Sequence, residues 1–418
     1  MRRSDDVGSV GVPVSRAVGA DGWEAGRMLG DARRRTSGQV AKFHTPEIVL
    51  GPGAFGEVPV ATAGLGMRRP FVVSDRCLER TPWYAQLIAG LRAGGLDAAS
   101  YLDVSPNPRS GEVAAAFLAY KAHDADGLVA LGGGSVIDAA KGVAVLAANG
   151  GHILEYEGID RARRPLPPLI AVPTTAGSGA DVSQFCIIND AERRTKVTII
   201  GRSLVPDVTV SDPTLLMTAP AEVTAQVGMD VLTHCVEAYV SLAHGRLTDS
   251  LALESIRGVW THLERLVDDP RDRVAAEEMS LAALRAGMAF TNAILGATHA
   301  MSHPVGGHCD APHGAINAVL LPHVIRYNAH VCADGFVDLA GAIGVETSGD
   351  ARTVADRLAD AIAALGARVG MPASLEPLGV RTADLDRLTT HALADSCMTT
   401  NPRRPQAAGI RDLYAEAL

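Results

Sequence analysis

The pattern of hydrophobic and polar positions divides the chain into parts of different character. From about residue 43 to about 212, apolar runs of strand length alternate with Ala- and Leu-rich stretches of helix length. Strands are predicted near 70–74, 99–104, 127–131 and 169–172, and helices near 83–94, 112–122 and 137–148. Because strands and helices that alternate with short connections are typical of a parallel sheet covered by helices, an α/β fold is expected here.

Strand patterns nearly vanish after Asp212 and Pro213, and helical periodicity takes over. Helices are predicted over 221–242, 247–267, 275–295, 315–328, 351–365 and 382–394. We find no repeat of fixed period, which argues against a solenoid or a propeller. The sequence therefore predicts a flexible N-terminal lead over 1–41, an α/β domain over 42–212 and a helical domain over 213–418.

Composition narrows the classes of function. The 418 residues include 47 acidic and 38 basic side chains, a net charge of −9, and only 4% aromatic residues, which argues against a nucleic-acid-binding protein. No apolar run reaches the ~18 residues of a membrane span, and the N-terminus lacks the apolar stretch of a secretory signal. The six cysteines form no CxxC pair, so we expect reduced thiols in a cytoplasmic protein.

Two glycine-rich loops follow predicted strands. Gly-Gly-Gly-Ser at 132–135 lies between a strand and a helix, where missing Cβ atoms let a ligand reach the backbone and the helix N-terminus favours a phosphate. Pro-Thr-Thr-Ala-Gly-Ser-Gly at 173–179 follows the strand over 169–172, at the edge where parallel sheets bind ligands. Either loop alone is compatible with an ordinary turn, but together they predict a nucleotide site.

Asp75 directly follows the predicted strand over 70–74. A carboxylate at a strand tip accepts hydrogen bonds from ribose hydroxyls and repels a 2′-phosphate, so NAD is expected in preference to NADP. Two alternatives stay open at this point. Asp75 is equally well placed to cap a helix, and the neighbouring Arg76 is able to accommodate a 2′-phosphate.

Histidines and one aspartate recur in the helical part at one-turn spacing. Asp230 and His234 are four residues apart, as are His299 and His303, and His313 follows ten residues later. Residues four apart share one face of a helix. A single histidine is more often structural than ligating, but a carboxylate and several imidazoles from different helices can converge on Zn²⁺, Fe²⁺ or a similar ion. The cluster therefore predicts a metal site.

These motifs resemble those of the iron-containing alcohol dehydrogenase family. The resemblance covers about residues 42–418 and rests on Gly-Gly-Gly-Ser-x-x-Asp-x-x-Lys at 132–141, Pro-Thr-Thr-Ala-Gly-Ser-Gly at 173–179, Gly-Met-Asp-x-Leu-Thr-His at 228–234 and the histidines at 299, 303 and 313. It implies a Rossmann-like dinucleotide-binding α/β domain, then an all-α metal-binding domain, in the architecture of dehydroquinate synthase. The active site would lie in the cleft between them.

The resemblance also implies roles for individual residues, and Fe²⁺ as the metal, with Zn²⁺ as the alternative. The metal ligands would be Asp230, His234, His299 and His313. His303 would lie near the nicotinamide and relay the proton, and Phe290 would form a wall of the pocket. The cofactor-binding residues would be Asp75, Asn107, Gly132, Gly133, Gly134, Ser135, Asp138, Thr174, Thr175, Ser178 and Lys196.

The expected reaction is hydride transfer between nicotinamide C4 and a small alcohol or aldehyde whose oxygen is polarised by the metal. The alternatives are a lyase resembling 3-dehydroquinate synthase and a non-enzymatic metal- or nucleotide-binding protein. The lyase needs several basic groups for a phosphate and a carboxylate, and the segment over 296–314 contains no Lys or Arg. A homodimer or larger homo-oligomer is expected, with neither nucleic acid nor membrane as a partner.

Overall fold

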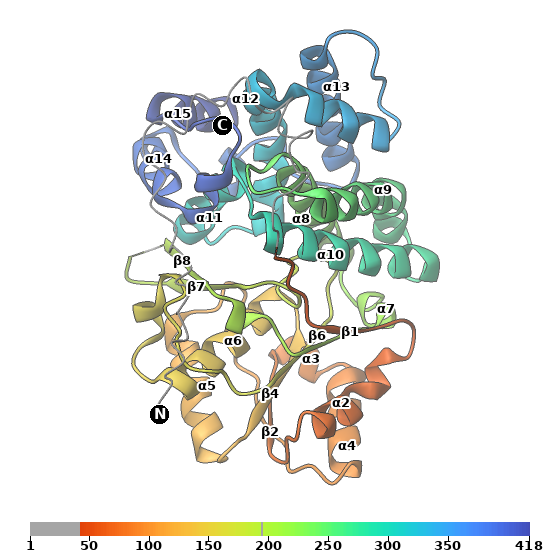
Figure 1. The fold of residues 1–418 in the computed structure, drawn as a ribbon, viewed down its shortest axis with the longest axis vertical. Coiled ribbons are helices and arrows are strands. Elements are labelled where there is room, and N and C mark those ends of the chain that lie inside the picture. Colours follow the sequence, from red (N-terminus) through yellow and green to blue (C-terminus); the bar gives the residue numbers. More distant parts are fainter. Residues whose placement is uncertain (1–41, 194) are drawn as a thin grey trace, which may run out of the picture.

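The computed structural model describes residues 42–193 and 195–418, so the lead predicted over 1–41 lies outside the described residues. Figure 1 shows two parts stacked along the long axis of the molecule. The lower part contains the parallel sheet and its helices, and the upper part is helical. No helix in the described ranges is long and apolar enough to cross a membrane.

A six-stranded sheet, parallel in every pairing, forms the centre of the lower part. Its strands in spatial order are β1 (Glu47–Leu50), β9 (Val208–Ser211), β6 (Leu169–Pro173), β4 (Gly127–Gly132), β2 (Pro70–Val73) and β3 (Ala99–Tyr101). The strands β2, β4, β6 and β9 are buried along their whole length. Burial on both faces explains why β2, β4 and β6 are continuous apolar runs in the sequence.

Helices cover both faces of this sheet. Alternate residues of β4 point to opposite faces: Val129 and Leu131 pack in one cluster, and Leu128 and Ala130 in another. The first cluster includes residues of α2 (Val58–Gly64) and α4 (Pro82–Ala93), and the second includes residues of α5 (Ser110–Ala122) and α6 (Gly134–Asn149). The short helix α3 (Arg76–Glu79) follows β2.

A smaller sheet, with strands in the order β5 (Gly158–Ile159), β8 (Thr195–Ile200) and β7 (Phe185–Asp190), lies beside the main one. The strands β7 and β8 pair as an antiparallel hairpin, and β8 contacts the helical part. The sequence analysis predicted none of β1, β5, β7, β8 and β9. The strands β1, β5 and β9 have two to four residues each, and polar residues such as Asn189 and Lys196 interrupt the apolar runs of β7 and β8.

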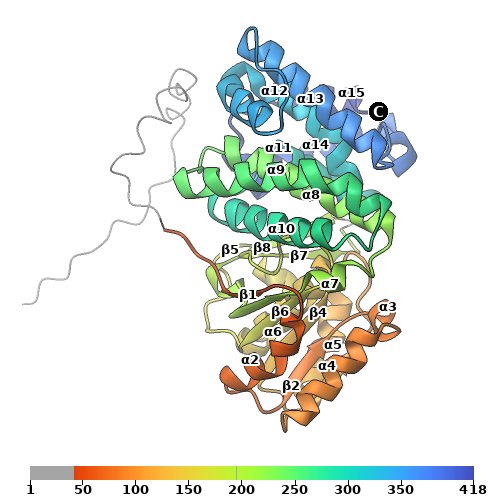
Figure 2. The ribbon, with the colours of Figure 1, turned by 90° about the vertical axis from the view of Figure 1, so that its right-hand side faces the viewer.

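The helical part begins at Pro213. Its helices are α7 (Pro213–Leu216), α8 (Ala221–Val240), α9 (Arg246–Asp268), α10 (Arg273–Ala293), α11 (Ala297–Cys309), α12 (His313–Ala342), α13 (Ala351–Arg368), α14 (Leu385–Ala394) and α15 (Ala407–Glu416). Figure 2 shows α10 as the helix of the upper part that lies next to the lower part, with α8 and α9 above it. The helix α12 extends well beyond the predicted 315–328, because it continues through Pro322 and a kink at Cys332.

Candidate active site

A cavity of about 1140 Å³ lies between the carboxyl ends of the parallel strands and the helical part. One wall, here called the sheet wall, comes from the segments that follow β2, β3, β4 and β6. The opposite wall, here called the helix wall, comes from α8, α10, α11 and the start of α12. Every residue that the sequence analysis assigned to the site lines this cavity except Gly132.

Gly132 ends β4 directly behind the cavity. A Cβ on Gly132 would lie 2.5 Å from Cβ of Val136, so this glycine allows α6 to pack against the strand that precedes it. A Cβ on Gly134 would lie 2.5 Å from Oγ of Ser178, so the two glycine-rich loops are in direct contact. The N-terminus of the 16-residue α6 therefore opens toward the cavity, where its dipole favours an anion.

The second loop is fixed to the first by hydrogen bonding and packing. The amide of Thr174 donates to the carbonyl of Gly132 over 3.1 Å, which continues the pairing of β4 and β6. Oγ1 of Thr175 would be 3.3 Å from a Cβ on Gly133. Hydroxyl groups and a helix N-terminus are thus presented side by side at one edge of the sheet.

The floor of the cavity holds two charged groups with shifted pKa values. Burial raises the pKa of Asp138 to about 7, although Lys141 and Lys196 oppose that rise. Burial lowers the pKa of Lys196, on β8, to about 8 against the attraction of Asp138 and Asp230. The third charged group, Lys141, does not line the cavity. Its Nζ instead donates to the carbonyls of Ser183 (2.8 Å) and Phe185 (2.7 Å).

Asp75 caps a helix and also lines the cavity. Its Oδ1 accepts hydrogen bonds from the amides of Cys77 (2.8 Å) and Leu78 (2.9 Å), so it is the N-cap of α3. The capping alternative that the sequence left open is therefore present in the structure. Nε of Arg76, the neighbouring guanidinium, donates to Oδ1 of Asp103 over 2.7 Å.

Four donor atoms on the helix wall converge. Oδ1 of Asp230 lies 3.7 Å from Nε2 of His234, 3.4 Å from Nε2 of His299 and 3.8 Å from Nε2 of His313. Ligand atoms placed roughly 2.0–2.2 Å from one ion in a tetrahedron are about 3.4 Å apart. Ligand atoms of Asp230, His299 and His313 all lie within 4.8 Å of one another, so these three residues of α8, α11 and α12 form a group that suits one divalent ion. His234 lies outside that group and approaches it through Asp230.

Burial and neighbouring charges shift the pKa values of all four residues. The surrounding imidazoles hold the pKa of Asp230 well below its usual range, although burial opposes this. Burial lowers the pKa of His234 to about 4 and that of His313 well below its usual value, which favours the neutral rings. The pKa of His299 is raised to about 9, because Glu237 and Asp230 outweigh the effect of burial.

His303 lines the same cavity, one helical turn after His299. Its Nδ1 donates to Oδ2 of Asp395 over 2.8 Å, and its ring stacks on that of His313 with 5.4 Å between the ring centroids. Oδ1 of Asp395 in turn accepts from the amide of Cys397 over 2.8 Å. The orientation of His303 is therefore set by a carboxylate that is itself held by the backbone.

Three polar residues that hydrogen-bond to side chains of the helix wall do not themselves line the cavity and were not predicted from the sequence. Nδ2 of Asn317 donates to Oδ1 of Asp230 over 2.7 Å, and Asn317 lies one turn after His313 on α12. Glu237 bonds to His299 and lies one turn after His234 on α8. Helical spacing from a predicted ligand was the signal for both. Asp395 had no local signal, because it is 92 residues away from its partner.

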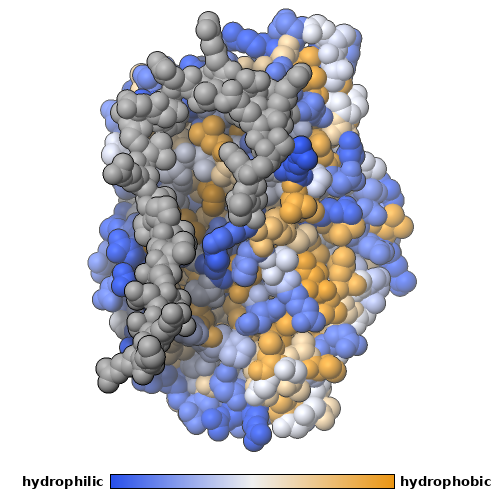
Figure 3. Space-filling model, viewed as in Figure 1, coloured by the Kyte–Doolittle hydropathy of each residue, from blue (hydrophilic) through white to orange (hydrophobic). Residues whose placement is uncertain are grey.

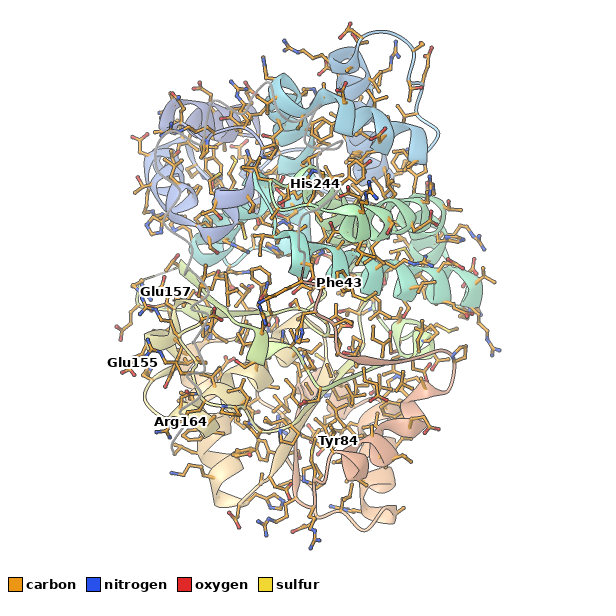
Figure 4. All side chains as sticks on the ribbon, in the orientation of Figure 1. Phe43, Tyr84, Glu155, Glu157, Arg164 and His244 are labelled. Carbon is orange, nitrogen blue, oxygen red and sulfur yellow. The ribbon has the colours of Figure 1, made fainter. Side chains whose placement is uncertain are left out.

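Other histidines lie outside the site. His244, labelled in the upper part of Figure 4, belongs to the helical part, and its Nδ1 lies 3.0 Å from Oδ1 of Asp249. Phe290, in contrast, is in the predicted place. Its ring lies 4.4 Å from that of His234 and lines the cavity together with Leu295 and Cys397.

Comparison with known proteins gives one consistent family. The model described as iron-containing alcohol dehydrogenase matches residues 45–213, and that described as Fe-containing alcohol dehydrogenase family, C-terminal, matches residues 224–418. A 1,3-propanediol dehydrogenase of Citrobacter freundii is 38% identical over 88% of this chain and 96% of its own length.

Two further relatives cover nearly the same residues. An NAD-dependent methanol dehydrogenase of Bacillus methanolicus is 33% identical over 90% of this chain and 99% of its own. The crystal structure of a 1,3-propanediol oxidoreductase superposes with a TM-score of 0.88 at 35% identity, and covers 91% of this chain and 100% of that one.

Proposed function

The chain belongs to the iron-containing alcohol dehydrogenase family, and from this premise we propose that it transfers a hydride between NAD and a small alcohol or aldehyde. The protein is a metal-dependent alcohol dehydrogenase or aldehyde reductase. The proposal adds the hydride carrier, the metal and the residues that hold them. The observation that carries it is the grouping of Asp230, His299 and His313, with His234 beside Asp230, across one cavity from the N-terminus of α6.

These four residues would hold a divalent ion, Fe²⁺ in the first place and Zn²⁺ as the alternative. Donor chemistry and spacing support this assignment, since neutral imidazole nitrogens and one carboxylate oxygen suit both ions. When bound, the ion supplies a Lewis acid that polarises the substrate oxygen. Nδ2 of Asn317 lies 2.7 Å from Oδ1 of Asp230, 3.3 Å from Nε2 of His299 and 3.2 Å from Nε2 of His313. This amide would therefore have to give up contacts with these atoms when the ion binds.

The sheet wall would hold NAD, the cofactor named for the Bacillus methanolicus relative. In the proposal, the backbone of Gly133 and Gly134 and the start of α6 bind the pyrophosphate, where the helix dipole stabilises negative charge. Gly132 supports that turn from behind by packing. The side chains proposed to contact NAD are Asp75, Asn107, Ser135, Asp138, Thr174, Thr175, Ser178 and Lys196.

His303 would move the proton. Because Asp395 accepts the Nδ1 hydrogen, Nε2 is the ring atom left to exchange a proton with the substrate oxygen, directly or through water or the ribose hydroxyls. Such a relay contributes roughly 10²–10⁴ in rate.

The cavity lining favours small uncharged substrates. Among the described residues that line it, the only Lys and Arg side chains are Arg76 and Lys196. The apolar residues Phe290, Leu295 and Cys397 line the same cavity as the proposed ligand histidines. This composition disfavours the lyase alternative, which needs basic groups for a phosphate and a carboxylate.

In this proposal, residues 42–212 form the nucleotide-binding domain and residues 213–418 form the metal-binding domain. The protein would assemble as a homodimer or a larger homo-oligomer. Support for assembly comes from β1, an edge strand of the six-stranded sheet in the described part, and from its exposed Leu50. In Figure 3 apolar residues gather in a band on the right of the face shown. Exposed edge strands and apolar patches are typical of contact surfaces.

Steady-state kinetics test the proposed function. The enzyme is stripped with a chelator, reconstituted with Fe²⁺ or Zn²⁺, and assayed with NADH and small aldehydes and with NAD and small alcohols. We expect turnover with NADH that disappears on stripping and returns on reconstitution. Absence of NADH consumption with every aldehyde, or an unchanged rate after complete stripping, would overturn the proposal.

A further inference from the structure

Glu237 joins two groups at the helix wall through its two carboxylate oxygens. It lies on α8, one turn after His234, and only 3% of its surface is exposed. Oε2 accepts the Nδ1 hydrogen of His299 over 2.6 Å, and Oε1 accepts the amide of Thr298 over 2.6 Å. One buried carboxylate thus contacts both the imidazole of His299 and the first turn of α11, the helix that carries it.

A second side chain closes over the same helix start. Oδ1 of Asn401 accepts the amide of Ala297 over 3.0 Å. A Cβ on Gly296, the N-cap of α11, would lie 3.0 Å from Oδ1 of Asn401 and 3.1 Å from Oε1 of Glu237. The two residues therefore share the capping of α11, but only Glu237 bonds the ring of His299.

The Nδ1 atoms of the three proposed ligand imidazoles have different surroundings. Nδ1 of His299 meets a carboxylate, and Nδ1 of His313 meets Oγ of Ser302 at 3.2 Å. Nδ1 of His234 is buried and has no hydrogen-bond partner in the described structure. Among these three rings, His299 alone has a carboxylate that specifies which nitrogen carries the hydrogen.

We propose that Glu237 is a positioning residue that sets the metal affinity of the site through His299. By accepting the hydrogen of Nδ1, it leaves Nε2, which lies 3.4 Å from Oδ1 of Asp230, as the ring nitrogen that would bind the metal. A carboxylate behind a ligand imidazole fixes the tautomer and ring orientation and raises basicity. The inference rests on the ligand set of the proposed function.

Glu237→Gln tests this role, since glutamine has nearly the same shape. Its amide can accept either the amide hydrogen of Thr298 or the Nδ1 hydrogen of His299, but not both. Zn²⁺ affinity is measured by competition with a chromophoric chelator, and the melting temperature of the metal-free protein is measured alongside. We expect Zn²⁺ to bind 10–100-fold more weakly in the variant.

Asn401→Ala is the matched control, because it removes a cap of α11 and leaves the ring of His299 bonded. We expect it to lower the melting temperature while Zn²⁺ affinity stays within about threefold of the wild type. Unchanged Zn²⁺ affinity in Glu237→Gln would overturn the inference. So would an equal loss of affinity in Asn401→Ala, because Glu237 would then act only through the stability of α11.

A measurement on the wild type keeps the inference testable if Glu237→Gln does not fold. Long-range ¹H–¹⁵N spectra of the Zn²⁺-loaded, histidine-labelled enzyme report the tautomer of His299. The Nδ1–H tautomer is expected, and the Nε2–H tautomer would overturn the inference. Failure of the ligand set is distinguished by His299→Ala: full Zn²⁺ affinity in that variant rejects the proposed metal site itself, whatever the result for Glu237.

Discussion

The two walls of the cavity bind their proposed ligands by opposite means. The sheet wall presents backbone and small side chains, and its glycines leave room where a Cβ would collide with the neighbouring loop. The helix wall presents long polar side chains whose atoms converge from three helices. The sheet wall thus depends on glycines, which have no side chain. The helix wall depends on polar side chains whose positions are fixed by hydrogen bonds.

This difference determines which substitutions each wall tolerates. On the sheet wall, one added carbon is expected to be more harmful than the loss of one hydroxyl, because the two loops are already in contact. On the helix wall, the loss of one polar group removes one hydrogen bond from buried partners such as Asp230 and His299. Substitutions that separate cofactor binding from metal binding therefore test the comparison.

The largest effect among these substitutions is expected for His303→Ala. Loss of the proton relay lowers kcat by about 10²–10⁴, while metal content and NADH affinity stay close to those of the wild type. Elemental analysis and steady-state rates on one preparation check this. Asp395→Asn is the matched variant, and a smaller loss is expected because the ring of His303 stays in place, although one amide oxygen must replace the two acceptors now used by His303 and the amide of Cys397. If His303→Ala contains no metal, His303 is a metal ligand. If its kcat equals that of the wild type, the role of His303 is structural.

A smaller effect is expected for Gly134→Ala on the opposite wall. The added Cβ lies 2.5 Å from Oγ of Ser178, so the loops must separate, and NADH binding weakens roughly tenfold at unchanged metal content. Fluorescence titration with NADH measures this change. Adding Ser178→Gly restores the space and is expected to recover part of the affinity. Wild-type NADH affinity in Gly134→Ala would show that this contact does not shape the cofactor site.

Asp75→Gly is expected to narrow a preference for NADH over NADPH by severalfold, since a carboxylate repels a 2′-phosphate. The same substitution removes the N-cap of α3. Asp75→Ser separates the two effects, because serine still caps a helix but carries no charge. We expect both variants to narrow the ratio of kcat/KM values. Equal efficiency of the wild type with both cofactors would contradict this role for Asp75.

The smallest effect is the pH dependence of NADH binding. As pH rises, Asp138 loses its proton near pH 7 and Lys196 near pH 8. Both changes make the floor of the cavity more negative, so the affinity for the anionic cofactor falls between pH 7 and 9. In Lys196→Met the total decline between pH 7 and 9 is expected to be smaller, because only Asp138 still titrates there, at a higher pH than in the wild type. A constant NADH dissociation constant across this range in the wild type would exclude the proposed contribution of Lys196.

The sequence was sufficient where function depends on local spacing. The apolar runs predicted β2, β4 and β6, and the one-turn spacing of Asp230 and His234 placed both on one face of α8. The glycine runs predicted loops at the carboxyl ends of β4 and β6, and the structure places both there. Each of these features is encoded within a few residues of chain.

The features of the fold and the site that the sequence did not predict depend mainly on contacts between distant segments. The strands β7 and β8 stabilise each other as a hairpin in which Lys196 pairs with Asn189, so neither has the apolar run of a central strand. Asp395 meets His303 only because α11 packs against the segment after α14. The role of Asp75 also could not be predicted from the sequence, because a carboxylate at a strand end has the same local pattern whether it caps a helix or faces a ribose.

Anomalous diffraction from crystals of the iron-loaded enzyme tests the central claim most directly. The account predicts one peak at the iron edge per chain within about 2.2 Å of Oδ1 of Asp230 and of Nε2 of His234, His299 and His313. It also predicts that this peak faces the glycine-rich loops across the cavity. A peak elsewhere, or no peak in crystals of fully active enzyme, would contradict the assignment of the metal to the helix wall.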